Sequence, residues 1–258
     1  MALPFITWPG GKTRLLKELI PRMPRDFKKY WEPFLGGGAL FFKVRPKEAV
    51  LSDANAELIN CYDAIKSDPE AVIRSLKMVQ YQRDTHPERF FRQVYDDYLP
   101  SGIYNQAARY IFISKHCSRG LIKRGSTCQL LGQSYRKHNF FNEEKIRRCG
   151  KALKNATVVK WPYRLINPQE GDFVYFDPPY YSTDDVYSDN FTEKDHIRLR
   201  NICNALDVKG VKFMLSNSWN KETREWYKDF NCISIGVNYG MKAGLQKGAS
   251  QELLVRNY

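Results

Sequence analysis

The sequence has few of the residues that disulfide frameworks, metal sites and membrane segments require. Its cysteines are scattered without a Cys-x-x-Cys pair, and it has only four histidines. This pattern fits reduced thiols better than disulfides or zinc, so we expect no bound metal. No apolar run approaches the roughly 18 residues of a membrane helix, and the N-terminus has no basic segment of a signal peptide. We expect a cytoplasmic protein with no membrane partner.

Acidic residues are also absent from residues 98–142, although the whole chain contains 28 of them. The chain has a net charge of +13, which favours a polyanionic partner, most often nucleic acid. The guanidinium group of Arg can donate two parallel hydrogen bonds to the edge of a guanine base. The ammonium group of Lys is a compact point charge that is better suited to phosphate. We therefore predict Arg119 and Arg124 as base readers and Lys123 and Lys137 as phosphate contacts, with Arg136 also on DNA. The alternative is a merely solvated basic face.

The most informative stretch runs from Gly171 to Tyr180. The apolar residues 173–176 predict a buried strand that stops at Asp177, because Pro178 cannot donate to a sheet ladder. Asp177 and the Pro178 carbonyl could accept both protons of an exocyclic amine and draw its nitrogen toward tetrahedral geometry. Tyr180 would offer a face on which an unstacked base could lie. A plain turn and a proline-rich docking peptide are the alternatives.

Two glycine-rich segments precede this stretch. Residues 8–12 read Trp-Pro-Gly-Gly-Lys, but a phosphate loop would need glycine at Ile6, so that motif fails on spacing. A plain turn before a helix remains the alternative there. Residues 32–38 read Glu-Pro-Phe-Leu-Gly-Gly-Gly, and Asp53 follows Gly36 by 17 residues at the end of a predicted strand. This spacing is close to that of an acid that meets ribose hydroxyls, and it indicates a nucleoside site.

The alternation of short apolar strands with helical stretches predicts an α/β sheet. Strands are expected over 30–34, 49–53, 173–176, 211–217 and 252–255. Helices are expected over 13–20 (ended by Pro21), 39–42, most of 54–97, 109–114 and 194–206. Residues 118–135 suit a hairpin or ordered loop, and residues 181–191 suit a lid.

Five motifs occur in an order that resembles the Dam-like DNA adenine N6-methyltransferases of phages and bacteria. They are residues 8–12, 32–38, Ser-Asp at 52–53, Asp-Pro-Pro-Tyr at 177–180 and Leu-Ser-Asn at 215–217. The resemblance spans nearly the whole chain. It departs at 118–125, where only Gly120-Leu121 matches the recognition segment of members that methylate GATC.

The resemblance implies a Rossmann-like, S-adenosylmethionine-dependent methyltransferase domain formed by residues 1–60 and 151–258. An inserted, mostly helical target-recognition domain carrying a hairpin would span residues 61–150. By position, the implied cofactor contacts are Trp8, Lys12, Phe34, Gly36, Asp53, Tyr163, Asp177 and Tyr187.

These features predict an enzyme that methylates the amino nitrogen of a flipped adenine in double-stranded DNA. Asp177, Pro178 and Tyr180 would be its catalytic residues, and S-adenosylmethionine its cofactor. We expect a monomer in a bacterial cell or a phage-infected host, and a cognate restriction enzyme is left open. The alternatives are a DNA cytosine-N4 or RNA adenine methyltransferase, a protein N-methyltransferase, or a catalytically silent DNA-binding protein. No Pro-Cys dipeptide is present, which fits direct transfer without a covalent enzyme intermediate.

Overall fold

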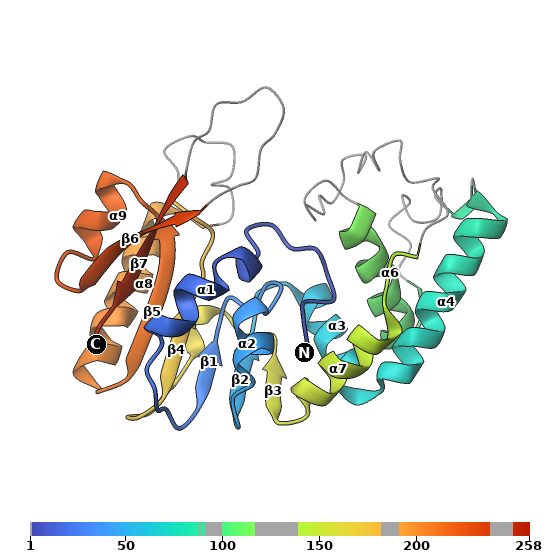
Figure 1. Cartoon of the computed structure of the whole chain (residues 1–258), viewed down its shortest axis with the longest axis horizontal. Coiled ribbons are helices and arrows are strands. Elements are labelled where there is room, and N and C mark those ends of the chain that lie inside the picture. Colours follow the sequence, from blue (N-terminus) through green and yellow to red (C-terminus); the bar gives the residue numbers. More distant parts are fainter. Residues whose placement is uncertain (1, 88, 91–99, 117–138, 182–190, 238–249) are drawn as a thin grey trace. The chain divides into compact units, whose positions relative to one another are not determined.

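The computed structural model describes residues 2–87, 89–90, 100–116, 139–181, 191–237 and 250–258 of the chain, which form two compact units (Figure 1). Unit 1 comprises Met1–Thr13, Gly36–Arg45 and Asp53–Lys160. Unit 2 comprises Arg14–Leu35, Pro46–Ser52 and Trp161–Tyr258. The division predicted from the sequence, with a recognition domain at 61–150, stays a prediction.

Six of the seven strands of the sheet lie in unit 2, in the order β2-β1-β4-β5-β7-β6. The first four are parallel, and β7 runs antiparallel to both β5 and β6. Their bounds are β1 Tyr30–Glu32, β2 Ala49–Ser52, β4 Phe173–Phe176, β5 Lys212–Ser218, β6 Asn231–Val237 and β7 Ser250–Arg256. The seventh strand, β3 (Ala156–Val159), belongs to unit 1. The predicted α/β class is confirmed, and the sheet is mostly parallel, whereas β3 and β6 were not predicted.

Strand β4 lies between β1 and β5, with Phe173 level with Tyr30 on one side and Lys212 on the other. All four of its residues are buried, as expected for a parallel strand covered on both faces. Because β1, β4 and β5 are parallel, the chain leaves all three at the same edge of the sheet. That edge is where ligands bind in open α/β sheets.

The helices of unit 2 are α1 (Leu16–Leu19), α8 (Glu193–Val208) and α9 (Lys221–Trp226), with short 3₁₀ turns η2 (Ile20–Arg22) and η4 (Tyr163–Leu165). A third turn, η1 (Lys12–Arg14), spans the boundary between the units. Capping boxes begin α8 and α9. The prediction that Pro21 ends the first helix is wrong in detail. Pro21 lies in the first turn of η2, where its missing N–H is not needed.

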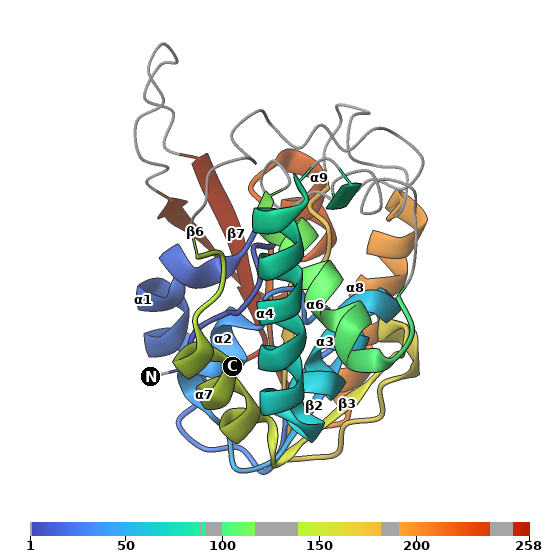
Figure 2. The same ribbon diagram turned by 90° about the vertical axis from the view of Figure 1, so that its right-hand side faces the viewer.

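Unit 1 is mainly helical (Figure 2). Asn55 and Asp68 cap α3 and α4, because each side chain accepts two backbone N–H groups. Helix α6 packs against both α3 and α4, and α7 packs against the same two helices. The helices are α2 (Ala39–Val44), α3 (Ala56–Ser67), α4 (Pro69–Thr85), α6 (Ile103–His116) and α7 (Glu143–Leu153).

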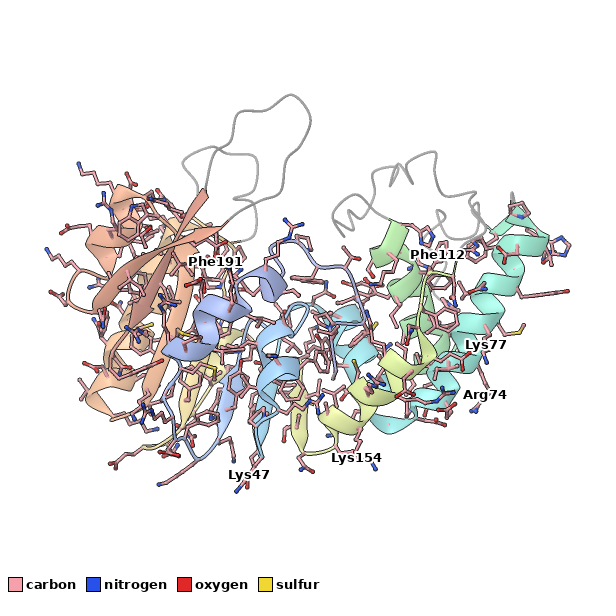
Figure 3. The ribbon with its side chains drawn as sticks, in the orientation of Figure 1. Lys47, Arg74, Lys77, Phe112, Lys154 and Phe191 are labelled. Atoms are coloured by element: carbon pink, nitrogen blue, oxygen red, sulfur yellow. The ribbon has the colours of Figure 1, made fainter. Side chains whose placement is uncertain are left out.

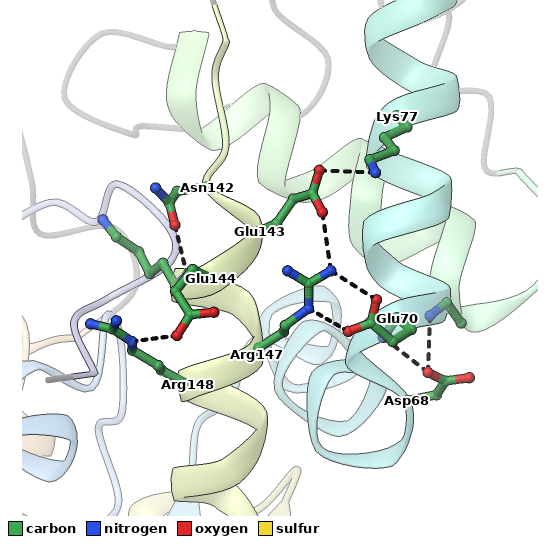
Figure 4. Close-up of polar contacts among 10 residues, drawn as sticks. Asp68, Glu70, Lys77, Asn142, Glu143, Glu144, Arg147 and Arg148 are labelled. Carbon is green, nitrogen blue, oxygen red and sulfur yellow. Dashed lines mark hydrogen bonds and ion pairs between the residues drawn. The ribbon is translucent and has the colours of Figure 1, made fainter.

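Ion pairs connect the outer surfaces of α4 and α7 (Figure 4). The Arg147 guanidinium donates to both carboxylate oxygens of Glu70 at 2.6 and 3.0 Å, and to Glu143 at 3.1 Å. Lys77 reaches the other oxygen of Glu143 at 2.9 Å. These side chains are well exposed, so the network aligns the two helices more than it stabilises the fold.

Gly150 of α7 lies close to both α3 and α4. A Cβ at Gly150 would lie 2.9 Å from the Ile65 carbonyl oxygen and 3.2 Å from Cγ of Pro69. Gly150→Val should therefore lower the free energy of unfolding by about 1–3 kcal/mol in a urea titration. Gly236→Val in β6 is the control, because nothing lies within 4 Å of its Cβ position. Equal stability of the two variants would contradict this packing.

Candidate functional site

The glycine loop after β1 is closely packed against Trp8 of the same unit. Gly36 has a φ of +46°, and a Cβ there would lie only 2.6 Å from the Trp8 indole Nε1. The Gly37 position comes within 3.4 Å of Trp8 Cβ. Glycine is required at Gly36 both for its left-handed backbone and for this approach. Gly36 and Gly37 of the motif at 32–38 thereby lie against Trp8 of the motif at 8–12, within unit 1.

Asp53 connects the glycine loop to the start of α3. Its Oδ2 accepts from the Gly36 N–H at 3.0 Å, and its Oδ1 accepts from the Asn55 N–H at 2.9 Å. Burial raises the pKa of Asp53, while the backbone donors oppose that rise. The Gly36 carbonyl accepts from the buried Tyr62 hydroxyl at 2.9 Å. Both backbone groups of Gly36 are therefore fixed by side chains from unit 1.

Lys12, another predicted cofactor contact, is 6% exposed at the start of η1. Its Nζ donates to the Gly10 carbonyl at 2.8 Å. The Gly11 N–H donates to the Trp8 carbonyl at 3.2 Å, which closes the turn. Of the predicted cofactor residues, Trp8, Lys12, Gly36 and Asp53 thus belong to unit 1.

In unit 2, the Asp-Pro-Pro-Tyr loop (residues 177–181) follows β4 directly. Pro178 is buried, and Asp177 and Tyr180 are half-buried. The backbone at Tyr181 is held by the end of β5. Its N–H donates to Asn217 Oδ1 at 3.1 Å, and its carbonyl accepts from Ser218 Oγ at 2.5 Å. The Leu-Ser-Asn motif therefore anchors the loop that carries Asp177.

His196 of α8 contacts both Asn217 and Tyr181, the residues that form this anchor. Asn217 Oδ1 already accepts backbone N–H groups, so its amide nitrogen is the donor toward His196 Nδ1, at 3.4 Å. The imidazole is stacked with Trp226 and meets the edge of Tyr181. Burial lowers the pKa of His196 to about 4, so the ring is neutral at physiological pH. A neutral ring leaves Nδ1 able to accept this contact.

Tyr180 is tied to a third strand. Its hydroxyl donates to Glu252 of β7, a residue 72 positions later in the chain. Burial, followed by the charges of Asp177 and Glu252, holds the pKa of Tyr180 well above its usual range. The phenol therefore stays protonated and remains a donor. Sequence reasoning missed Glu252, for which the only signal was a lone acid at the start of an apolar run.

Three aromatic side chains form a cluster near the ends of β1 and β4. Phe34 and Tyr163 are stacked with centroids 5.1 Å apart, and Phe191, which is labelled in Figure 3, meets both rings. That separation leaves no room for another ring between Phe34 and Tyr163. The Tyr163 hydroxyl lies 3.3 Å from the Asp195 carbonyl oxygen. Two predicted cofactor residues thus contact each other, and Phe191 was not predicted.

The remaining predicted site residues lie outside the described residues: Tyr187, Arg119, Lys123, Arg124, Arg136 and Lys137. Within the described part of the chain, no three His, Cys, Asp or Glu side chains gather into a group that could hold a metal ion. None of the described helices is long and apolar enough to cross a membrane.

The sheet and the motifs at its strand ends define a Rossmann-like methyltransferase fold. Residues 8–241 match the model of the D12 class N6 adenine-specific DNA methyltransferases, and the chain belongs to this family. It is thus a DNA adenine N6-methyltransferase.

Relatives match along almost the whole chain. The Type II methyltransferase M1.LlaDCHI of Lactococcus lactis subsp. cremoris is 34% identical over 99% of this chain and 95% of its own length. The Type II methyltransferase M.MjaIII of Methanocaldococcus jannaschii is 30% identical over 99% of both chains. The retron Ec67 DNA adenine methylase of Escherichia coli is 28% identical over 97% of this chain and 90% of its own length.

Two asparagines at opposite ends of β5 allow the loop anchor to be tested. Asn217 holds the Tyr181 backbone, whereas Asn257 accepts from the Phe213 N–H at 2.8 Å at the other end of the strand. Replacing either by Ala should cost about 1–2 kcal/mol of stability, since each leaves buried backbone groups unpaired. Only Asn217→Ala should also slow methyl transfer to DNA, by about tenfold or more. Parallel urea titrations and single-turnover assays test this, and equal rates in the two variants would contradict the anchoring role.

Proposed function

We propose that this enzyme transfers a methyl group from S-adenosylmethionine to the amino nitrogen of a flipped adenine at a specific sequence in double-stranded DNA. The observation that carries the proposal is the fixed Asp-Pro-Pro-Tyr loop at the end of β4. In this proposal Asp177 and the Pro178 carbonyl accept hydrogen bonds from the two amine protons. The nitrogen lone pair is then drawn out of conjugation with the purine ring, toward the geometry of the transition state. The N–CH3 bond would form as the sulfonium S–CH3 bond breaks, with S-adenosylhomocysteine as the leaving group and loss of one amine proton. Flipping the base out of the stack costs a few kcal/mol.

The residues of unit 1 fit the ribose end of the cofactor. A carboxylate offers about four acceptor sites. Asp53 uses three of them for the backbone of Gly36, Ala54 and Asn55, which leaves capacity for a ribose hydroxyl. We assign Trp8, Lys12, Gly36 and Asp53 of unit 1 to the cofactor. S-adenosylmethionine supplies an activated methyl group on a sulfonium sulfur.

Unit 2 contributes the other proposed cofactor residues, Phe34, Tyr163 and Asp177. Because Phe34 and Tyr163 stack directly, a cofactor ring would lie against an outer face of this pair rather than between the two rings. Tyr187, outside the described residues, completes the proposed set. No step in the proposed reaction assigns a role to a metal.

DNA recognition is proposed for residues 61–150, with the base-reading segment at 119–137. The described part of this region consists mainly of packed helices, and α6 ends at His116, shortly before the proposed base-reading segment. Rigid helices would hold such a segment in place. A DNA substrate and the free thiols of Cys61, Cys149, Cys203 and Cys232 support a cytoplasmic location for the enzyme.

Asp177→Asn tests the proposed mechanism. The variant keeps the shape of the side chain but weakens the acceptor for the amine, so single-turnover transfer should fall about a hundredfold or more. The assay follows tritium from labelled S-adenosylmethionine into plasmid DNA without adenine methylation, with RNA and protein as competing acceptors. Asp172→Asn is the matched control at the other end of β4, where the carboxylate accepts from Trp31 Nε1 at 2.9 Å. It should transfer at the wild-type rate. Wild-type transfer by Asp177→Asn would contradict the mechanism.

Alanine variants of Arg119, Arg124, Lys123 and Lys137 test the recognition segment. Loss of a lysine that meets only phosphate should weaken binding to all sequences and lower the log–log salt slope by about 0.9 per contact. Loss of an arginine that reads a base edge should reduce the difference in binding free energy between the correct and the wrong base at one position by about 1–3 kcal/mol. Salt-dependent binding and modified-base sequencing measure the two effects. If all four variants shift affinity uniformly and keep the methylated motif, recognition lies elsewhere.

A further inference from the structure

Glu252 is a buried carboxylate in the middle of the antiparallel part of the sheet. It is 4% exposed and stands opposite Ser218 of β5 on one side and Ile235 of β6 on the other. A carboxylate buried in a sheet is costly unless it is hydrogen-bonded. Here it accepts the hydroxyl of Tyr180, in a charge-assisted bond between β7 and the Asp-Pro-Pro-Tyr loop.

A second tyrosine–carboxylate pair in the same sheet shows what is particular to Tyr180. The Tyr30 hydroxyl donates to Glu32 at 2.8 Å, but Tyr30 is 0% exposed. Its ring therefore contributes only to the packing of the core. Tyr180 as a residue is only partly buried, and its hydroxyl is held by Glu252. An aromatic side chain held in this way can present a ring to a ligand.

The part of the sheet in which Ser218 stands opposite Glu252 also fixes Tyr181, the residue that follows Tyr180. Ser218, directly opposite Glu252, donates to the Tyr181 carbonyl, and Asn217 accepts the Tyr181 N–H. The side chain of Tyr180 is therefore held at its far end by β7, and the adjoining backbone is held by β5. Two anchors at opposite ends of the residue fix where its ring lies.

We propose that Glu252 is a positioning residue that fixes the place of the Tyr180 ring, on which the flipped adenine lies. This inference rests on the proposed function and extends it to a residue on the antiparallel strand β7. A ring oriented before the base arrives loses less conformational freedom when the base stacks on it. The loss of this bond should therefore reduce both the rate of transfer and the stacking of the extruded base.

The test is a double-mutant cycle with Tyr180→Phe and Glu252→Leu. Phe keeps the ring without the hydroxyl, and Leu roughly keeps the volume without the acceptor. Each single variant should lower kcat/KM for DNA about tenfold to a hundredfold, as expected for a bond to a charged group. The double variant should lose no more than either single one, because both remove the same bond. Glu252→Gln keeps an acceptor and should restore most of the activity.

A second readout follows the base itself, in duplexes that carry 2-aminopurine at the target adenine. The target site is first defined by sequencing DNA methylated by the wild-type enzyme. The fluorescence of extruded 2-aminopurine is quenched when the base stacks on an aromatic ring. Complexes of Tyr180→Phe and Glu252→Leu should therefore fluoresce more strongly than the wild-type complex. Tyr258→Phe is the control, since its hydroxyl donates to the Arg22 carbonyl at 2.8 Å, away from the loop. It should match the wild type in both readouts.

The outcomes separate the two proposals. Additive losses in the cycle, or an unchanged 2-aminopurine signal in folded variants, would overturn the positioning role while leaving DNA methylation intact. If Glu252→Leu does not fold, Tyr180→Phe and Glu252→Gln are compared instead, and wild-type kinetics in Tyr180→Phe would overturn the role. A wild-type enzyme that transfers no methyl group to DNA adenine would overturn the proposed function itself.

Discussion

Two consecutive prolines follow the buried strand β4 and fix much of the backbone that leaves it. A segment with so little torsional freedom places Asp177 and Tyr180 accurately only if its far end is also held. That far end is Tyr181, whose N–H and carbonyl are bound by Asn217 and Ser218. The geometry of the proposed amine site therefore depends on the last residues of β5 as much as on the Asp-Pro-Pro-Tyr sequence.

Unit 1 shows the same principle at the glycine loop. The backbone of Gly36 is bound on both sides, by Asp53 at its N–H and by Tyr62 at its carbonyl, and Trp8 occupies the space that a side chain would need. Gly36 is thus required by packing within the protein, apart from any ligand. A cofactor that binds there meets a surface that is already formed, which reduces the entropy lost on binding.

The elements closest to the motifs were the most predictable from the sequence. Strand β4 was predicted to the residue, because its four apolar residues lie between Gly171 and Asp177 and both ends carry turn signals. Strand β3 was missed because its short exposed–buried pattern gives a weak signal. Strand β6 was also missed, although its seven residues alternate apolar side chains with Ser234 and Gly236. The partner of Tyr180 could not be predicted, because Glu252 is distant in the chain and only the antiparallel register of β5 and β7 brings it near. Whether the proposed cofactor and DNA residues act as assigned stays a prediction.

The most direct test of the central claim is sequencing of modified bases in plasmid DNA from a host that lacks adenine methylases and expresses this enzyme. The same host with an empty vector provides the baseline. We expect N6-methyladenine at every copy of one short sequence motif, and no modification at any other base. N4-methylcytosine in place of N6-methyladenine, or unmodified DNA from cells that contain the folded protein, would contradict the central claim.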